Sequence, residues 1–201
     1  MINNIIFDLG NVLFRWKPEK FLLRFTKDKQ EIKWFLDNII HSREWLNLDR
    51  GLITLEDARI QLISQYPQKQ DLITLFFNNW MEMLTPIEKN VSIVKDLKKN
   101  GFKIYILSNY IEAAFDYIRK NNDFLSLFDG KIISGLEKVN KPDKKIYEIL
   151  IKKYALNPKE CVFIDDVKPF LRPAKKLGMK VIWNIEYTDL RGELKKLGIK
   201  I

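Results

Sequence analysis

Five short apolar runs rich in β-branched residues recur along the chain. They are "NNIIFDL", "FKIYILS", "GKIIS", "CVFID" and "MKVIW", which begin at residues 3, 102, 130, 161 and 179. In the second half they alternate with segments of helical period, such as 86–100 and 143–156. This alternation predicts an α/β fold with a parallel sheet and crossover helices. The continuous apolar character of the runs suits strands that are buried on both faces.

The first two runs are separated by far more chain than the roughly 30 residues of a βαβ unit. The intervening segments carry the helix-start signals Pro18, Asp28 and Thr54 and show no strand-like alternation. We therefore expect a core of residues 1–14 and 87–201, with a small helical subdomain inserted at residues 15–86. The Trp and Phe residues of the insertion are expected to form its own core.

Length and cysteine content narrow the class of protein. A chain of 201 residues suits one domain, or one domain with an insertion. No window approaches the roughly 18 apolar residues of a membrane span, so we expect a cytoplasmic protein without membrane contact. Cys161 is the only cysteine and cannot form an internal disulfide. Because it opens an apolar run, we expect a buried thiol.

The net charge of +9 raises the question of nucleic acid binding. The lysines, however, fall in pairs across separate helical segments, without a block of like charge or interleaved aromatic residues. This distribution is typical of solvated helix faces, so we expect no nucleic acid partner. A modest attraction for small anions is consistent with the charge.

Three of the apolar runs end in polar residues: Asp8, the pair Ser108 and Asn109, and the pair Asp165 and Asp166. Each alone is compatible with a turn or a helix cap. Together they indicate a site, because ligands of open α/β sheets bind outside the carboxyl ends of the strands. Converging carboxylates repel one another unless a cation neutralises them. With oxygen ligands only, Mg²⁺ is the expected ion, and it commonly keeps a substrate phosphate in its shell.

A phosphate at this edge needs further donors. Ser108 and Asn109 are expected to enter a helix N-terminus and to offer a hydroxyl and backbone N–H groups. Lys141, which precedes Pro142 at the start of a predicted helix, is expected to supply a point charge. The single histidine, His41, lies in the insertion and is expected to be structural or exposed.

These residues occur in a pattern that resembles the haloacid dehalogenase superfamily of aspartyl-nucleophile hydrolases. The resemblance is closest to its "FDLGNV" branch, which includes sugar-1-phosphate phosphatases, and spans nearly the whole chain. It rests on "FDLGNVL" at 7–13, "LDRG" at 48–51, "ILSN" at 106–109, "NKPDKKIY" at 140–147 and "VFIDD" at 162–166. The continuation "DDVKPFLRPAKKLGM" is also similar to the phosphatase domain of mammalian soluble epoxide hydrolase.

The resemblance implies a role for each residue of the predicted site. Asp8 corresponds to the nucleophile that takes the phosphoryl group, and it also contacts the metal. Ser108 and Lys141 correspond to the residues that hold the transferring phosphate. Asp166, with Asp165 beside it, corresponds to the Mg²⁺ ligands.

The resemblance also implies an architecture and an activity. The core becomes Rossmann-like, and residues 15–86 become a helical cap that excludes water and contacts the leaving group. The activity implied is Mg²⁺-dependent hydrolysis of a small phosphorylated metabolite, with a sugar phosphate as one possibility. Phe170 differs from the Asn usual in this branch, which weakens the expected support of the metal. The sequence predicts neither the individual substrate nor the oligomeric state.

Gly10 departs from most phosphatases of the superfamily, which carry an acid/base Asp at this position. The family's metal contact there is made by the backbone carbonyl, which glycine keeps. General acid–base help is worth typically 10²–10⁴-fold, so we expect slow breakdown of the phosphorylated Asp8 unless Glu44 or Asp49 substitutes. We also expect Gly10 to adopt a positive φ, where a side chain would add strain.

Two other functions compete with this prediction. A regulatory relative that binds phosphorylated ligands without turnover is consistent with the loss of the acid at Gly10. Dehalogenase chemistry uses the same kind of aspartate without metal. A site without metal does not explain why the acidic residues Asp165 and Asp166 lie together. Turnover is favoured by the presence of the full set of Asp8, Ser108, Lys141 and Asp166.

Overall fold

The five predicted strands form one parallel sheet in the computed structural model, which describes residues 1–201. The strand order is β3-β2-β1-β4-β5, so β1 lies at the centre, and every pair is parallel. The strands are β1 (Asn4–Phe7), β2 (Lys103–Ser108), β3 (Gly130–Ile133), β4 (Cys161–Asp165) and β5 (Lys180–Trp183). The predicted α/β fold is therefore confirmed.

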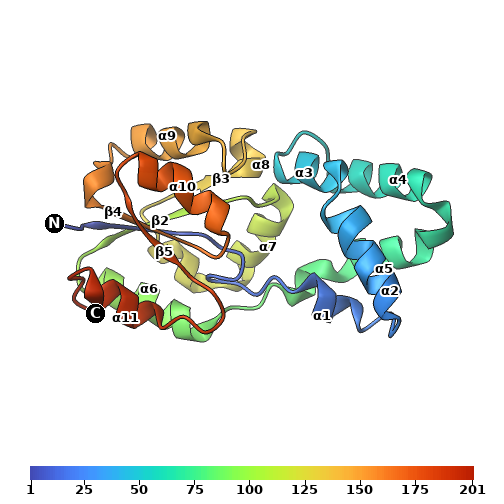
Figure 1. Ribbon diagram of the computed structural model, residues 1–201, viewed down its shortest axis with the longest axis horizontal. Coiled ribbons are helices and arrows are strands. Elements are labelled where there is room, and N and C mark those ends of the chain that lie inside the picture. The colour runs from blue at the N-terminus through green and yellow to red at the C-terminus, as the bar shows by residue number, and fades with distance from the viewer.

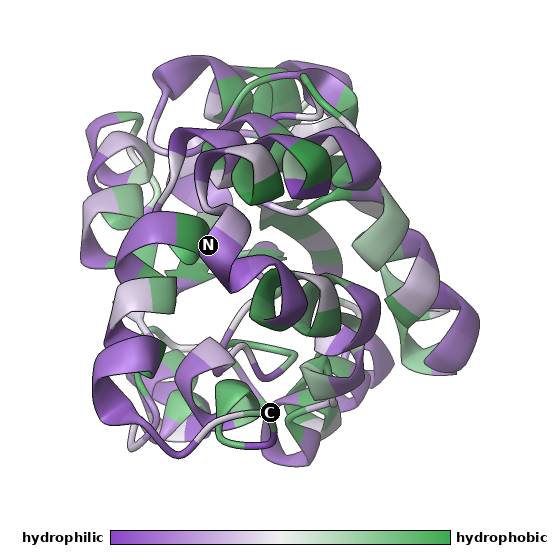
Figure 2. Cartoon of the chain, turned by 90° about the vertical axis from the view of Figure 1, so that its right-hand side faces the viewer, coloured by the Kyte–Doolittle hydropathy of each residue, from purple (hydrophilic) through white to green (hydrophobic).

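Helices cover both faces of the sheet, with α8, α9 and α10 on one side and α6 and α11 on the other (Figure 1). Their bounds are α6 (Glu88–Lys99), α7 (Glu112–Asn121), η4 (Asp123–Leu127), α8 (Ser134–Glu137), α9 (Lys144–Lys153), η5 (Pro158–Glu160), α10 (Lys168–Lys176) and α11 (Leu190–Lys196). Successive strand residues point to opposite faces, so Ile5 and Ile6 belong to different apolar clusters. Figure 2 shows the apolar strands surrounded by helices with polar bands. Cys161 is buried, as predicted.

The chain between β1 and β2 contains helices and no strand of the sheet. These helices form a second body at the end of the molecule opposite to both termini (Figure 1). They are α1 (Pro18–Leu22), α2 (Lys29–Phe35), η1 (Leu36–Ile40), α3 (Arg43–Asp49), α4 (Leu55–Gln65), η2 (Pro67–Lys69), α5 (Gln70–Asn79) and η3 (Trp80–Met83). We call this segment the helical insertion. Across the whole chain, no helix combines the length and apolar character needed to cross a membrane.

Local signals explain where the helices of the insertion begin. Pro18 occupies the first turn of α1, and the Asp28 side chain caps α2 by accepting from Gln30 N. Thr54 and Asp57 form a reciprocal capping box at the start of α4. Helix α3, which the sequence analysis does not predict, begins after Ser42.

Two neighbouring backbone segments, outside the strands of the sheet, join the insertion to the core. Phe14 and Pro86 form an isolated antiparallel bridge. Next to it, Arg15 N donates to the Thr85 carbonyl at 2.9 Å, and the Arg15 guanidinium donates to the Pro86 carbonyl at 2.9 Å. The entry and exit of the insertion therefore lie side by side.

Candidate active site

The predicted site residues gather at the carboxyl ends of the three central strands. Asp8 follows β1, Ser108 ends β2 and Asp165 ends β4. Because β1 is hydrogen-bonded to both β2 and β4, these three side chains meet at one edge of the sheet. Lys141 reaches the same place from the loop before α9.

Lys141 is the central cation of the site. Its Nζ lies 2.8 Å from Asp8 Oδ1, 2.6 Å from Asp165 Oδ2 and 3.2 Å from the Leu107 carbonyl oxygen. Burial alone would lower the pKa of Lys141, but the carboxylates of Asp165 and Asp8 outweigh burial and raise that pKa. The ammonium therefore stays charged and is fixed beside Asp8.

Aromatic rings complete the surroundings of this ammonium. Nζ of Lys141 lies 5.4 Å from the ring centroid of Phe163 and 5.1 Å from that of Phe170. These distances suit cation–π attraction. Phe170 therefore supports the lysine, a role that the sequence analysis does not anticipate.

Asn109 holds the main chain of Lys141 in place. Its Nδ2 donates to the Lys141 carbonyl at 3.0 Å, and its Oδ1 accepts from Lys141 N at 2.7 Å. Ser108 is 1% exposed, and its hydroxyl has no hydrogen-bond partner. Because buried polar atoms are normally paired, this hydroxyl is suited to a ligand oxygen. Helix α7 begins only at Glu112, so Ser108, the last residue of β2, and Asn109, in the loop that follows, both lie before its N-terminus, and the expected helix N-terminus is a wrong prediction.

Three carboxylates are arranged to hold a cation. One oxygen each of Asp8, Asp165 and Asp166 lies within 4.8 Å of the others. The two oxygens of Asp165 are already engaged, by Lys141 and by Val167 N at 2.8 Å. Burial and then the charge of Asp8 raise the pKa of Asp166 to about 6. A divalent cation would offset this repulsion, and all three ligands are hard oxygens.

Asn11 orients Asp166, and the sequence analysis does not single it out. Its Nδ2 donates to Asp166 Oδ2 at 3.0 Å, which leaves the other carboxylate oxygen of Asp166 without a protein donor. Asn11 has a φ of 49°, in the left-handed region that Asn tolerates better than most residues. Its position inside "FDLGNV" is the signal that marks it.

Gly10 does not adopt a positive φ, so the expected strain is a wrong prediction. A Cβ built there would lie 3.9 Å from Trp16 Cβ and 4.0 Å from Asp8 Oδ2, which are ordinary contacts. The site therefore has room for a Cβ at this position. The Gly10 carbonyl oxygen accepts none of the backbone hydrogen bonds outside helices and strands, so it is free to bind a cation.

Helix α3 of the insertion is attached to the core next to this site. Ser134 Oγ donates to the Asp49 carbonyl at 2.6 Å, and Lys138 Nζ donates to the Gly51 carbonyl at 2.6 Å. Gly51 has a φ of +63°, and a Cβ there would lie 2.2 Å from the Gly135 carbonyl oxygen. Glycine in "LDRG" permits this close approach. The attachment positions the side chain of Asp49.

Asp49 is the carboxylate of the insertion that acts electrostatically on the site. Burial and then the charge of Asp8 raise its pKa to about 7, while the ammonium of Lys141 opposes the shift. No hydrogen bond contributes to this shift. Glu44, the other candidate, accepts instead from Gln65 Nε2 at 2.8 Å, on the neighbouring helix α4.

A small aromatic cavity of about 100 Å³ adjoins Asp49. Its lining residues are Trp16, Trp45, Asp49, Trp80, Asn109, Tyr110, Ile111 and Ala114. The Tyr110 hydroxyl is buried without a partner, and burial followed by the charges of Asp8 and Asp49 raises its pKa above the usual range. It therefore remains a hydrogen-bond donor. Trp45 and Trp80 belong to an apolar cluster that also contains residues of the sheet, and the partly buried Trp16 packs against it, so the insertion does not form a separate core as expected. All three Trp residues also line this cavity.

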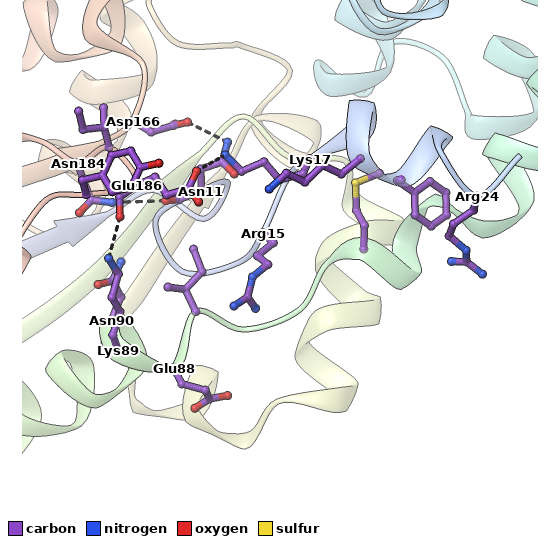
Figure 3. Close-up of a pocket in the computed structure, with 16 residues that line it drawn as sticks. Asn11, Arg15, Lys17, Arg24, Glu88, Lys89, Asn90, Asp166, Asn184 and Glu186 are labelled. Atoms are coloured by element: carbon purple, nitrogen blue, oxygen red, sulfur yellow. Dashed lines mark hydrogen bonds and ion pairs between the residues drawn. The ribbon is translucent and has the colours of Figure 1, made fainter. Parts of the chain in front are cut away.

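A larger cleft of about 970 Å³ lies on the Asp166 side (Figure 3). Asp166 lies at one end of the cleft and Arg24 at the other. Its basic residues are partly neutralised, because Lys17 pairs with Glu186 at 3.3 Å and Arg24 pairs with Glu82 at 2.7 Å. The cleft is thus polar, in contrast to the aromatic cavity.

A family model described as haloacid dehalogenase-like hydrolase matches residues 2–176. A sesquiterpene phosphatase of Aspergillus oryzae is 32% identical over 174 residues, covering 87% of this chain and 85% of that protein. A D-ribitol-5-phosphate phosphatase of Bacteroides thetaiotaomicron is 22% identical over 205 residues, covering 96% of this chain and 97% of that protein.

A similar solved structure is a haloacid dehalogenase family enzyme of Bacteroides thetaiotaomicron in complex with magnesium and inorganic phosphate. The TM-score is 0.72 at 22% identity, covering 96% of this chain and 99% of that one. This likeness shows the fold.

Proposed function

Because the chain belongs to the haloacid dehalogenase-like hydrolase family, we propose that it is a Mg²⁺-dependent phosphatase whose nucleophile is Asp8. The observation that carries the proposal is the placement of Asp8 between the Lys141 ammonium and the acidic pair, at the edge that also holds Ser108. The names of two relatives, a sesquiterpene phosphatase and a ribitol-phosphate phosphatase, support this reaction class. The magnesium and phosphate complex of the solved neighbour supports the ion.

Asp8, Asp166 and the Gly10 carbonyl are the proposed Mg²⁺ ligands, with Asp165 beside them. The oxygen-only donor set fits this ion. When bound, Mg²⁺ neutralises charge on the carboxylates and on the substrate phosphate.

The reaction proceeds in two displacements. A carboxylate oxygen of Asp8 attacks phosphorus, the ester P–O bond breaks, and the leaving alcohol oxygen takes a proton. Lys141 and the Ser108 hydroxyl bind the phosphoryl oxygens throughout. Water then attacks phosphorus, gives up a proton, and displaces the Asp8 carboxylate with release of inorganic phosphate.

We propose that Asp49 performs the proton transfers that Gly10 cannot. Asp49 interacts electrostatically with Asp8, and its pKa of about 7 suits both donation and acceptance near neutral pH. Glu44 instead accepts a hydrogen bond from Gln65 on α4, which favours Asp49 for this role. Turnover is then faster than the loss of the acid at Gly10 alone would allow.

We also propose a role for each of the two parts of the chain. Residues 1–14 and 87–201 form the hydrolase core, and residues 15–86 form a cap that closes over the phosphate. The adjacent linkers at Arg15 and Pro86 support this assignment, because two neighbouring segments can act as one hinge. Closure would bring Asp49 and the aromatic cavity onto the substrate.

Hydrolysis of an aryl phosphate, measured with Mg²⁺ and with EDTA, tests the proposed function. Wild type should release phosphate only with Mg²⁺, and Asp8→Asn should lose at least a thousandfold in kcat. Asp116→Asn, on an exposed helix face, is the matched control and should retain activity. Equal activity of Asp8→Asn and wild type would overturn the proposal. Phosphate binding without turnover would instead favour the regulatory relative, and halide release without Mg²⁺ a dehalogenase.

A further inference from the structure

We propose that the aromatic cavity beside Asp49 receives an apolar leaving group, so that the substrate is a phosphate monoester of an apolar alcohol rather than of a sugar or polyol. This inference rests on the proposed phosphatase function and specifies its substrate class. Three features of the cavity carry it: its position, the chemistry of its walls and its supply of polar groups.

Two residues that line the cavity lie beside the groups that are proposed to react. Asn109, one of its lining residues, follows Ser108 directly and holds the backbone of Lys141. Asp49, another lining residue, is close enough to Asp8 and Lys141 for their charges to shift its pKa. We therefore expect the leaving alcohol to enter this cavity.

The walls come from both bodies of the molecule and are almost entirely apolar. The helical insertion contributes the indole rings of Trp16, Trp45 and Trp80, and the core contributes Ile111 and Ala114. Each pair of the three indole rings has its centroids 5.6 Å apart, so the rings support one another. Rigid aromatic surfaces of this kind bind apolar groups at a small cost in conformational entropy.

Few polar groups are available to a ligand in this space. The side chain of Asn109 is engaged at both ends with Lys141. Asp49 is the proposed acid, and the Tyr110 hydroxyl is buried without a partner. The remaining unpaired group is Trp80 Nε1, which is a donor only.

A polyol would therefore lose affinity on entering the cavity. Its successive hydroxyl groups would give up water without finding partners, at a cost for each unpaired group. An alkyl, aryl or isoprenoid chain has no such groups and gains from burial against the indole rings. The larger cleft offers the opposite chemistry, because Arg15 and Lys20 line it without a salt-bridge partner and would favour a second anionic group.

The test is a homologous series of methyl, ethyl, propyl and butyl phosphate, assayed with wild type and Mg²⁺. From ethyl onward the alcohol pKa changes little, so differences in kcat/KM report binding of the chain. We expect kcat/KM to rise about fourfold per methylene until the cavity of about 100 Å³ is filled. Butyl phosphate should exceed erythritol 4-phosphate, its hydroxylated counterpart of equal length, by at least tenfold.

Variants link the trend to the cavity. Trp16→Ala should reduce the ratio of kcat/KM for butyl over methyl phosphate at least tenfold, and Trp80→Phe should reduce it less. Trp80→Phe keeps an aromatic ring, so it provides a folded variant for this test if Trp16→Ala does not fold. The matched control is Trp34→Ala, in helix α2 against Tyr66 and outside the cavity, which should leave the ratio unchanged.

Two results would overturn the inference while leaving the phosphatase proposal intact. One is a flat series in which erythritol 4-phosphate is the better substrate. The other is a preference for bisphosphates that is lost on Lys20→Ala, which would assign recognition to the larger cleft. Failure to hydrolyse any phosphate monoester, aryl phosphates included, would instead count against the proposed function itself.

Discussion

Asp165 and Lys141 form a buried ion pair, with the ammonium 2.6 Å from Oδ2 and the Asp165 side chain fully shielded from solvent. The second oxygen of Asp165 accepts from Val167 N at 2.8 Å. Both oxygens of Asp165 are therefore engaged, one of them by Lys141, whereas one oxygen of Asp166 accepts no hydrogen bond from the protein. The adjacent carboxylates thus have different tasks.

This difference predicts that Mg²⁺ binding depends on Asp166 more than on Asp165. Asp166→Ala should weaken Mg²⁺ affinity at least tenfold in titration calorimetry, because it removes a ligand. Asp165→Ala should weaken it less, through displacement of Lys141. The assignment is reversed if Asp165→Ala abolishes binding and Asp166→Ala leaves it intact.

The buried ion pair of Lys141 with Asp165 predicts that removal of the Lys141 side chain strongly lowers the free energy of unfolding. Lys141→Ala leaves the carboxylates of Asp8 and Asp165 buried without their cation. Breaking a buried pair in this way typically costs about 3–5 kcal/mol, measurable by urea unfolding without Mg²⁺. The exposed Lys145→Ala, in the same segment, should change the free energy of unfolding by less than about 0.5 kcal/mol. Equal effects of the two variants would contradict the charge arrangement.

The proposed role of Asp49 can be tested by removing its carboxylate and introducing an aspartate at Gly10 instead. Asp49→Asn should lower kcat about 10²–10⁴-fold on an alkyl phosphate, whose leaving group needs a proton. Adding Gly10→Asp to this variant should restore at least tenfold, because a Cβ at Gly10 makes only ordinary contacts beside Asp8. Glu44→Gln serves as the control on the same helix. Absence of any loss in Asp49→Asn would remove Asp49 from the mechanism.

The pKa of Asp49 also predicts a dependence of stability on pH. Its folded pKa of about 7 lies above the unfolded value of about 3.9. As pH rises from 4 to above 7, the unfolded state loses this proton before the folded state does, so Asp49 increasingly destabilises the fold. Asp49→Asn should therefore raise the melting temperature more at pH 8 than at pH 4, measured with EDTA. A larger gain at pH 4 would contradict the raised pKa.

The sequence alone predicts the sheet and most of the site. The five apolar runs are continuous and β-branched, which suits strands buried on both faces. The central strands β1, β2 and β4 are buried in this way, whereas the edge strands β3 and β5 are partly exposed. Asp8, Ser108 and Asp165 could be placed together because parallel strands share a carboxyl edge. Each of these signals is local to one run of residues.

The contacts between the core and the insertion could not be predicted in the same way. Helix α3 has the capping residue Ser42, whose hydroxyl accepts from Trp45 N, but its apolar pattern is short. Whether Asp49 or Glu44 faces the core depends on how α3 packs against α8, and no local pattern encodes that contact. The positive φ expected at Gly10 occurs instead at the next residue, Asn11.

Rapid-quench kinetics on wild type and Asp49→Asn, with an aryl phosphate and Mg²⁺, test the central claim most directly. An aryl leaving group departs without a proton, so Asp49→Asn should still form the phosphorylated Asp8 but hydrolyse it slowly. The account predicts a burst of about one equivalent of aryl alcohol in this variant, with an acid-stable phosphoryl group on the peptide that contains Asp8. Wild type should show little accumulation. Linear release from both proteins, with no phosphoryl group on Asp8 in either, would contradict the account.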